Sequence, residues 1–188
     1  MAKSWLEWVA GMGDVSWDRR MHPAPDIPPL QPTDFDPLTG TLNWVKFTEV
    51  LEATRSQSAG ALLVVDLDDR SSAIDMIATE HGADVLPWLA QAIRQAVRAD
   101  DLVSHLHGYR FAVLLRGAAP EVATSVADRV RESVEDTMFT TVAGAARLGV
   151  AIGGVIFDSS GSREGDLVQS AAANLDAAQS TASQVKIR

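Results

Sequence analysis

The sequence predicts an α+β fold in which a mixed, mostly antiparallel sheet of about five strands is flanked by helices. Short apolar runs that end in acidic or turn residues are typical of buried strands, and longer segments with apolar residues three or four positions apart are typical of helices. These segments follow one another as helix, strand, helix, hairpin, helix, strand, helix. Because this order combines a hairpin with crossover connections, we expect a mixed sheet with helices on its faces.

The first segments of this order have clear patterns. Residues 43–54 carry an apolar face with helical spacing, and residues 61–68, ALLVVDLD, form a continuous apolar run that ends in acids. A second helix is expected from about residue 82 to residue 97. Its apolar side consists of Val85, Leu86, Leu89, Ile93 and Val97.

The stretch HLHGYRFAVLL indicates a hairpin after this helix. We expect strands at 102–106 and 110–115, joined by a two-residue break at His107-Gly108. A helix is expected to begin at Pro120, because valines recur behind it at four-residue steps. The sequence then predicts a strand, an alanine-rich helix and a short edge strand, at residues 148–157, 164–182 and 185–187.

The chain divides into a tryptophan-rich helical segment at residues 1–20, a proline-rich linker at 21–35 and a domain at 36–188. The linker holds five of the eight prolines, which exclude a helix there. A short helix around Trp5 and Trp8 is marginal in water, so its indoles need a surface to pack on. That surface is either the chain's own domain or a second subunit or partner protein.

Composition excludes several classes of protein. The net charge of −9 argues against a general binder of DNA or RNA backbones. No run approaches the roughly 20 apolar residues of a membrane span, and no secretion-signal pattern is found. The absence of cysteine excludes disulfides and thiolate metal sites. A cytoplasmic protein is therefore expected.

Four motifs resemble, in their order and spacing, those of the GGDEF family of diguanylate cyclase domains. They are DPLTGTLN before a helix, Asp66 and Asp68 at the end of a strand, the hairpin HLHGYRFAVLL, and the late strand LGVAIGGV. The resemblance spans roughly residues 34–188 and implies the nucleotide-cyclase-like palm fold. Such enzymes join two molecules of GTP into cyclic di-GMP between antiparallel subunits, with magnesium holding the triphosphates.

The positions that would hold the metal and start this reaction depart from the family pattern. Asp66 keeps the first metal position. Tyr109 stands where the family has a metal-binding acid, and Arg110 where it has the acid that helps to activate the attacking hydroxyl group. His107 replaces the first signature glycine. The resemblance therefore implies no catalytic residues, with Asp66, Tyr109 and Arg110 as vestigial positions, and neither magnesium nor another cofactor is expected.

Positions that contact GTP in the family have changed as well. The family's guanine-reading asparagine and aspartate align with Ile74 and Ala83, which cannot read a base edge. Its two phosphate-binding lysines and an arginine align with Ser71, Gln179 and Ser183. Asp66 and Asp68 leave two interpretations open. They could bind a stray metal ion, or they are remnants of the lost site.

A second nucleotide site of the family, the inhibitory site or I-site, is matched. Its R-x-x-D motif corresponds to Arg98 and Asp101, and Arg129 falls on the family's secondary arginine. Arginine forks onto a guanine edge or a phosphate, and aspartate accepts from guanine N–H groups. The motif is short and recurs at 163–166, where it is given no role, so a solvated ion pair remains the alternative.

These observations predict a catalytically inactive domain that acts as a receptor for cyclic di-GMP through Arg98, Asp101 and Arg129. Cyclic di-GMP commonly binds such sites as an intercalated dimer, so a ligand-stabilised homodimer is expected. A protein partner is expected to contact Trp5 and Trp8. Two alternatives stay open: a protein-interaction module that binds no nucleotide, and a domain with weak GTP binding or residual cyclase activity.

Overall fold

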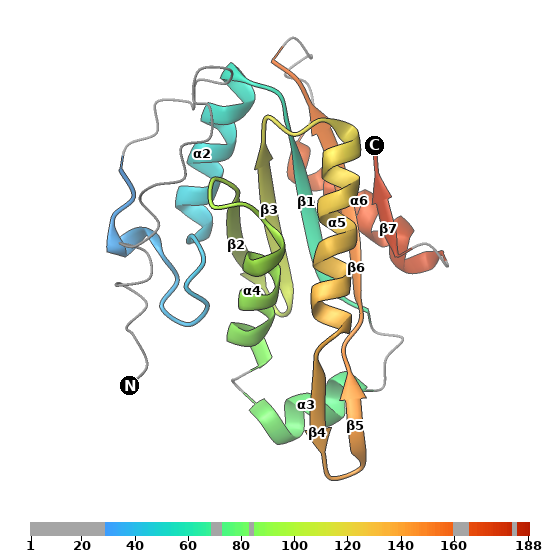
Figure 1. Ribbon diagram of the computed structural model, residues 1–188. Helices are drawn as coiled ribbons and strands as arrows, with labels where there is room; N and C mark the ends of the chain where they lie inside the picture. The colour runs from blue at the N-terminus through green and yellow to red at the C-terminus, as the bar shows by residue number, and fades with distance from the viewer. Residues whose placement is uncertain (1–28, 69–72, 83–84, 160–165, 182–183) are drawn as a thin grey trace.

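A five-stranded sheet forms the centre of the computed structural model, which describes residues 29–68, 73–82, 85–159, 166–181 and 184–188 (Figure 1). The strands are β1 (Gly60–Leu67), β2 (Leu102–His107), β3 (Arg110–Arg116), β6 (Val150–Phe157) and β7 (Val185–Ile187). They lie in the order β2-β3-β1-β6-β7. All neighbours pair antiparallel except β6 and β7, which are parallel. The sheet is mixed and mostly antiparallel, as the sequence predicts.

Two pairs of helices cover the two faces of this sheet (Figure 1). They are α2 (Trp44–Gln57), α4 (Val85–Ala96), α5 (Pro120–Glu135) and α6 (Leu167–Ser180). α4 and α5 share a core with Leu63 and Val65 of β1. α2 and α6 share a core with Leu62 and Val64, which point to the opposite face. The central strand is therefore buried on both sides.

Local sequence determines where three of these helices begin. Asn43 precedes α2, and its side chain accepts a hydrogen bond from the N–H of Lys46 at 2.9 Å. Asp166 caps α6 in the same way, accepting from the N–H of Val168 at 2.8 Å. α5 begins at Pro120, where the missing N–H would have had no partner within the helix. These residues mark the starts of the helices in the sequence itself.

The edge strand β2 is partly covered by the chain that leads into α2. The N–H of Leu42 donates to the carbonyl of Val103 at 2.9 Å, and Ser104 Oγ donates to the carbonyl of Leu42 at 2.8 Å. The N–H of His105 donates to Thr41 Oγ1 at 3.1 Å. These bonds satisfy backbone groups that an edge strand otherwise leaves unpaired.

One part of the fold was not predicted from the apolar pattern. Below the sheet in Figure 1 lie a short helix, α3 (Ala73–His81), and a hairpin of β4 (Met138–Thr141) and β5 (Gly144–Arg147). Phe139 of this hairpin packs edge-on against Trp88 of α4, with ring centroids 4.7 Å apart. Strands of four residues are too short for their alternation to be recognised in the sequence.

The helix predicted from about residue 82 is described from Val85 to Ala96, and Gly82, with a φ of +52°, follows the end of the separate helix α3. One predicted boundary is wrong. The hairpin turn is Gly108-Tyr109, because His107 still belongs to the ladder between β2 and β3. Gly108 has a φ of +55°, which a residue without a Cβ atom adopts without strain.

The segment predicted at 1–20 lies outside the described residues, as does the linker up to residue 28. The described end of the linker forms a 3₁₀ turn, η1 (Pro32–Asp34). Across the ranges that the structure describes, none of the helices has the length and apolar character required to cross a bilayer.

Close packing of β6 against α6 can be tested at Gly153. A Cβ atom there would lie 2.0 Å from Leu175 N and 2.4 Å from Ala171 O, both backbone atoms of α6. We expect Gly153→Ala to lower the free energy of unfolding by about 3 kcal/mol or more, because the helix must move away from the sheet. Urea denaturation followed by circular dichroism measures this. In the control Gly149→Ala, the new Cβ meets only Asp68 Cβ at 3.8 Å, and an equal loss in both variants would contradict the close packing.

Candidate functional site

The hairpin between β2 and β3 brings Arg110 next to Asp66 at the end of β1. Val65 pairs with Phe111 in the antiparallel ladder. Asp66 follows Val65 and Arg110 precedes Phe111, so the two meet at this end of the sheet. Arg110 Nε and Nη2 both donate to Asp66 Oδ2, at 2.9 and 2.8 Å. The two side chains are 24% and 20% exposed, so the ion pair is shielded from most of the solvent.

This corner of the molecule does not fit a magnesium ion. Magnesium requires oxygen ligands in octahedral geometry, usually carboxylates and water. The Asp66 carboxylate is bound to a permanent cation, and Arg110 repels a second cation at this position. Tyr109 is half-buried against the core beneath α4 and α5. Within the described ranges, no three His, Asp or Glu side chains are grouped so that they could hold a metal.

His105 holds the hairpin together, a role that the sequence pattern does not indicate. Its Nε2 lies 2.9 Å from the carbonyl oxygen of Gly108, so the tautomer with a proton on Nε2 donates across the turn. The ring also packs against Phe111, with ring centroids 5.1 Å apart. His107 beside it is exposed. These contacts of His105 thus hold the turn of the hairpin.

The turn from Arg98 to Asp101 lies at the other end of β2, away from the hairpin. The N–H of Arg98 donates to Asp101 Oδ2 at 2.9 Å, and the N–H of Asp101 donates to the carbonyl of Arg98 at 3.2 Å. Asp101 is only 5% exposed, whereas Arg98 is exposed. The structure therefore joins the two motif residues through the backbone of Arg98, and the Asp101 carboxylate holds the turn.

Two further arginines, which sequence reasoning missed, fix this turn. Arg94 Nη1 donates to the carbonyl of Asp101 and Arg116 Nε donates to the carbonyl of Asp100, each at 2.9 Å. They come from the last turn of α4 and the last residue of β3. No spacing in the sequence signals them, because their contact depends on how α4 and β3 meet at this end of the sheet.

Asp101 titrates differently from an exposed carboxyl group. Burial raises its pKa above the ordinary value of 3.8, while the hydrogen bond from Arg98 and the charges of Arg98 and Arg116 oppose this effect. Burial lowers the pKa of Arg94, and the charge of Asp101 counteracts that change. In a chain of net charge −9, three arginines thus gather around one buried carboxyl group.

The remaining predicted contacts are spread over the molecule. Arg129 is exposed on α5, and none of the contacts among described residues joins it to the Arg98–Asp101 turn. Gln179 lies on α6, which packs on the opposite face of the sheet from α5. Asp68 is 6% exposed, and its N–H donates to the carbonyl of Gly149 at 2.9 Å. The aligned family positions outside the described residues are Ser71, Ala83 and Ser183.

The sequence also matches known proteins. The family model described as diguanylate cyclase, GGDEF domain, matches residues 33–184. Diguanylate cyclase DgcM of Escherichia coli (strain K12) is 30% identical over 123 residues, which are 63% of this chain and 29% of that protein. The chain spans less than a third of the length of the curated relatives it matches.

Solved structures share the fold described above. The coiled coil and GGDEF domain of DgcB from Caulobacter crescentus, in complex with c-di-GMP, matches with a TM-score of 0.71 at 19% identity, over 83% of this chain and 86% of that one. Diguanylate cyclase SiaD, in complex with its activator SiaC from Pseudomonas aeruginosa, matches with a TM-score of 0.69 at 24% identity, over 82% and 61%. At these identities the likeness shows the fold, and the predicted palm fold is confirmed.

The ion pair at the hairpin predicts an energetic coupling between Asp66 and Arg110. We expect Asp66→Asn and Arg110→Gln to show a coupling of about 1 kcal/mol in a double-mutant cycle, because the pair is partly shielded and two N–H groups share one oxygen. The coupling should fall as salt is raised, since salt screens partly exposed charges. Urea denaturation at two salt concentrations measures it. A smaller coupling is expected for the control pair Lys46 and Glu49, because the Glu49 side chain is 61% exposed and a single bond joins the two. Additive effects at Asp66 and Arg110 would contradict the ion pair.

The raised pKa of Asp101 predicts how stability changes with pH. The folded chain binds the proton of the Asp101 carboxyl group more tightly than the unfolded chain does. Loss of this proton therefore lowers the free energy of unfolding as the pH rises from 3.8 through the raised pKa. Asp101→Asn has no such proton, and its amide oxygen still accepts from the N–H of Arg98. We expect the melting temperature of the variant, relative to the unchanged chain, to increase across this pH window. Calorimetric scans at a series of pH values measure it, and a relative decrease would show that the pKa is not raised.

Proposed function

This chain belongs to the GGDEF domain family, and we propose that it is a member without cyclase activity that binds cyclic di-GMP at the Arg98–Asp101 turn. The observation that carries the proposal is the construction of this turn. Arg94 and Arg116 hold two of its carbonyl groups, and the Arg98 side chain is exposed to solvent. A rigid, positively charged turn of this kind suits an anionic nucleotide.

The hairpin end of the sheet supports the loss of cyclase activity. Joining two GTP molecules depends on positioning the triphosphates and neutralising their charge with metal ions. Two hydrogen bonds from Arg110 occupy the carboxylate of Asp66. A metal ion would have to displace this cation, and the adjacent Tyr109 offers only a neutral phenol. Arg110 and Asp66 thus stabilise the hairpin instead of holding a metal.

The chemistry of the Arg98–Asp101 turn supports cyclic di-GMP as the ligand. The guanidinium of Arg98 matches the O6 and N7 atoms of guanine, or two oxygens of a phosphate. A carboxylate has about four acceptor sites, so Asp101 can accept guanine N–H groups in addition to the N–H of Arg98. Arg129 on α5 would act as the secondary contact. The DgcB domain, which has the same fold, is solved in complex with c-di-GMP.

The signal would leave the domain by dimerisation or through a protein partner. Two copies of a ligand with two guanines can cross-link two domains, which gives a ligand-stabilised homodimer. A partner is the other route, and SiaD, which has the same fold, is solved with its activator SiaC. The contact of a partner with Trp5 and Trp8 stays a prediction, because both lie outside the described residues. A cytoplasmic location is part of the same proposal.

The burial of Asp101 favours one alternative. If its carboxylate serves only to hold the turn, guanine has no acceptor there, and the domain is a protein-interaction module that binds no nucleotide. Weak GTP binding or residual cyclase activity is the other alternative, and the occupied carboxylate of Asp66 argues against it.

Isothermal titration with cyclic di-GMP tests the proposed receptor. We expect the full chain to bind, and Arg98→Ala to lose tenfold or more in affinity, because a hydrogen bond to a charged group contributes about 1.5–3 kcal/mol. Arg129→Ala should lose less. The matched control is Arg131→Ala on the same helix, where the guanidinium pairs with Glu135 at 2.6 Å and no loss is expected.

Each alternative gives a different result. No heat at high micromolar ligand, or undiminished binding by Arg98→Ala, would overturn the receptor. An interaction module shows no shift in melting temperature with cyclic di-GMP or GTP. A residual cyclase forms cyclic di-GMP when it is incubated with GTP and magnesium, and we expect no product.

A further inference from the structure

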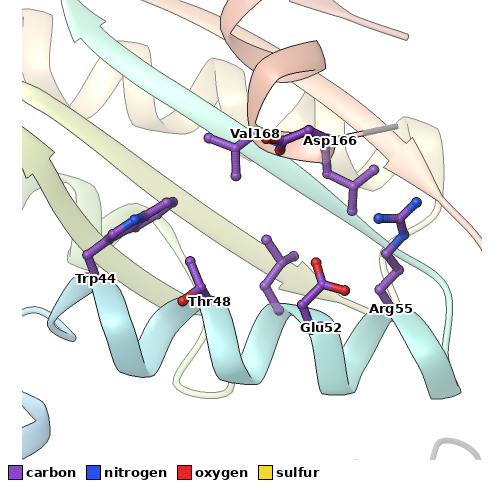
Figure 2. A pocket seen from close by; sticks show the side chains of 8 residues that line it. Trp44, Thr48, Glu52, Arg55, Asp166 and Val168 are labelled. Carbon is purple, nitrogen blue, oxygen red and sulfur yellow. The ribbon is translucent and has the colours of Figure 1, made fainter. Parts of the chain in front are cut away.

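A groove of about 550 Å³ lies between α2 and the start of α6 (Figure 2). Figure 2 shows side chains of the two helices pointing toward one another across it. The volume is within the range of about 300–1,000 Å³ that is typical of ligand sites, so the groove can admit large side chains. The lining residues are Trp44, Thr48, Leu51, Glu52 and Arg55 on α2, and Asp166, Leu167 and Val168 at α6.

The groove combines an aromatic end with acidic groups. Trp44 lies at one end and stacks on Phe47, with ring centroids 5.5 Å apart. Glu52 on one side and Asp166 on the other bring two carboxylates to its border. Arg55 at the far end has interactions of its own. A segment that carries an aromatic ring next to basic residues would match this surface.

The chain enters the described fold beside the aromatic end of the groove. The N–H of Asn43 donates to the carbonyl of Asp34 at 2.7 Å, and Asn43 Nδ2 donates to the carbonyl of Thr33 at 3.0 Å. These bonds hold the segment before α2 against the start of that helix, where Trp44 lies. Thr33 and Asp34 therefore lie next to this end of the groove, a few residues after residue 28.

Large apolar side chains are exposed in the part of the sequence that leads into α2. They are Leu30, Leu38 and Val45, and Val45 directly follows Trp44. Single exposed apolar residues are ordinary on a protein surface, so the groove itself carries the argument.

We propose that residues 15–20 of this chain, VSWDRR, dock in the groove, with the indole of Trp17 against Trp44 and Leu51. An indole gains by leaving water for an aromatic and aliphatic surface, and two stacked or edge-on rings add to this. Trp17 is the nearest of the three N-terminal tryptophans to the described fold, which makes it the one with the shortest tether.

Charge complementarity supports this segment. Arg19 and Arg20 follow Trp17 directly, and they place two guanidinium groups within reach of Glu52 and Asp166 at the border of the groove. Guanidinium groups form the strongest side-chain hydrogen bonds with carboxylates.

The length of the intervening chain permits the contact. The 11 residues from 18 to 28 span at most about 36–40 Å when extended. α2 has 14 residues and is therefore about 21 Å long. The whole groove is within reach, and a short tether keeps the segment at a millimolar effective concentration, which favours the chain's own segment over that of a second copy.

This docking goes beyond the proposed receptor function and does not depend on it. The groove lies on the face of the sheet covered by α2 and α6, whereas Arg129 lies on α5 at the other face. Trp5 and Trp8 remain available to a partner. Trp17→Ala should therefore bind cyclic di-GMP like the unchanged chain.

Disulfide trapping tests the docking, because the chain contains no cysteine. Ser16→Cys is combined with Thr48→Cys in the groove, and in a matched control with Thr124→Cys on α5. Thr124 is an exposed threonine on the opposite face of the sheet. Circular dichroism and melting temperature establish that both variants fold alike. After mild oxidation, mass spectrometry of non-reduced peptides measures the rate of the cross-link within one chain.

We expect the pair with Thr48→Cys to form at least tenfold faster than the pair with Thr124→Cys. Adding Trp17→Ala should reduce the rate to that of the control. Equal rates for the two pairs, or a rate that Trp17→Ala leaves unchanged, would overturn the proposal. Disulfide-linked dimers in place of the internal cross-link would overturn it as well, because the groove would then receive the segment of a second copy.

Discussion

Burial of β1 on both faces is the constraint on which the other elements depend. Its apolar side chains from Ala61 to Val65 are 0% exposed, and they alternate between two cores. Each core needs a layer of helices above it, and both edges of the strand need a neighbouring strand to satisfy the backbone, which β3 and β6 supply. Asp66 is the first side chain of the strand to leave the core, so the same constraint determines where its carboxylate emerges.

Arginine has opposite electrostatic effects at the two ends of β2. At the hairpin, Arg110 binds a carboxylate, and the two charges cancel. At the turn, Arg94 and Arg116 bind carbonyl oxygens of Asp101 and Asp100, which carry no net charge. Their positive charge is therefore only partly compensated, by the carboxylates of the turn itself. The first arrangement repels a second cation, whereas in the proposed receptor the second arrangement would attract an anion.

The family and the layered α+β fold were predicted correctly from the sequence, because both rest on patterns along the chain. Apolar periodicity and capping residues such as Asn43 are local, so they give the helices and central strands. The contact of Asp66 with Arg110 joins residues 44 positions apart, and only the register of β1 and β3 places them together. Arg94 and Arg116 were missed for the same reason, and α3 and the β4–β5 hairpin because they are too short to show a clear apolar pattern.

The coverage of β2 by Thr41 and Leu42 limits the ways in which two copies of the domain can assemble. Backbone groups of Val103, Ser104 and His105 already have partners in the same chain. Two sheets cannot merge into one continuous sheet along this part of the edge. Association on this side must use side chains and bound molecules, which separate without breaking a strand ladder. For the ligand-stabilised homodimer proposed above, such contacts would allow the assembly to form and dissolve as the concentration of a small messenger rises and falls.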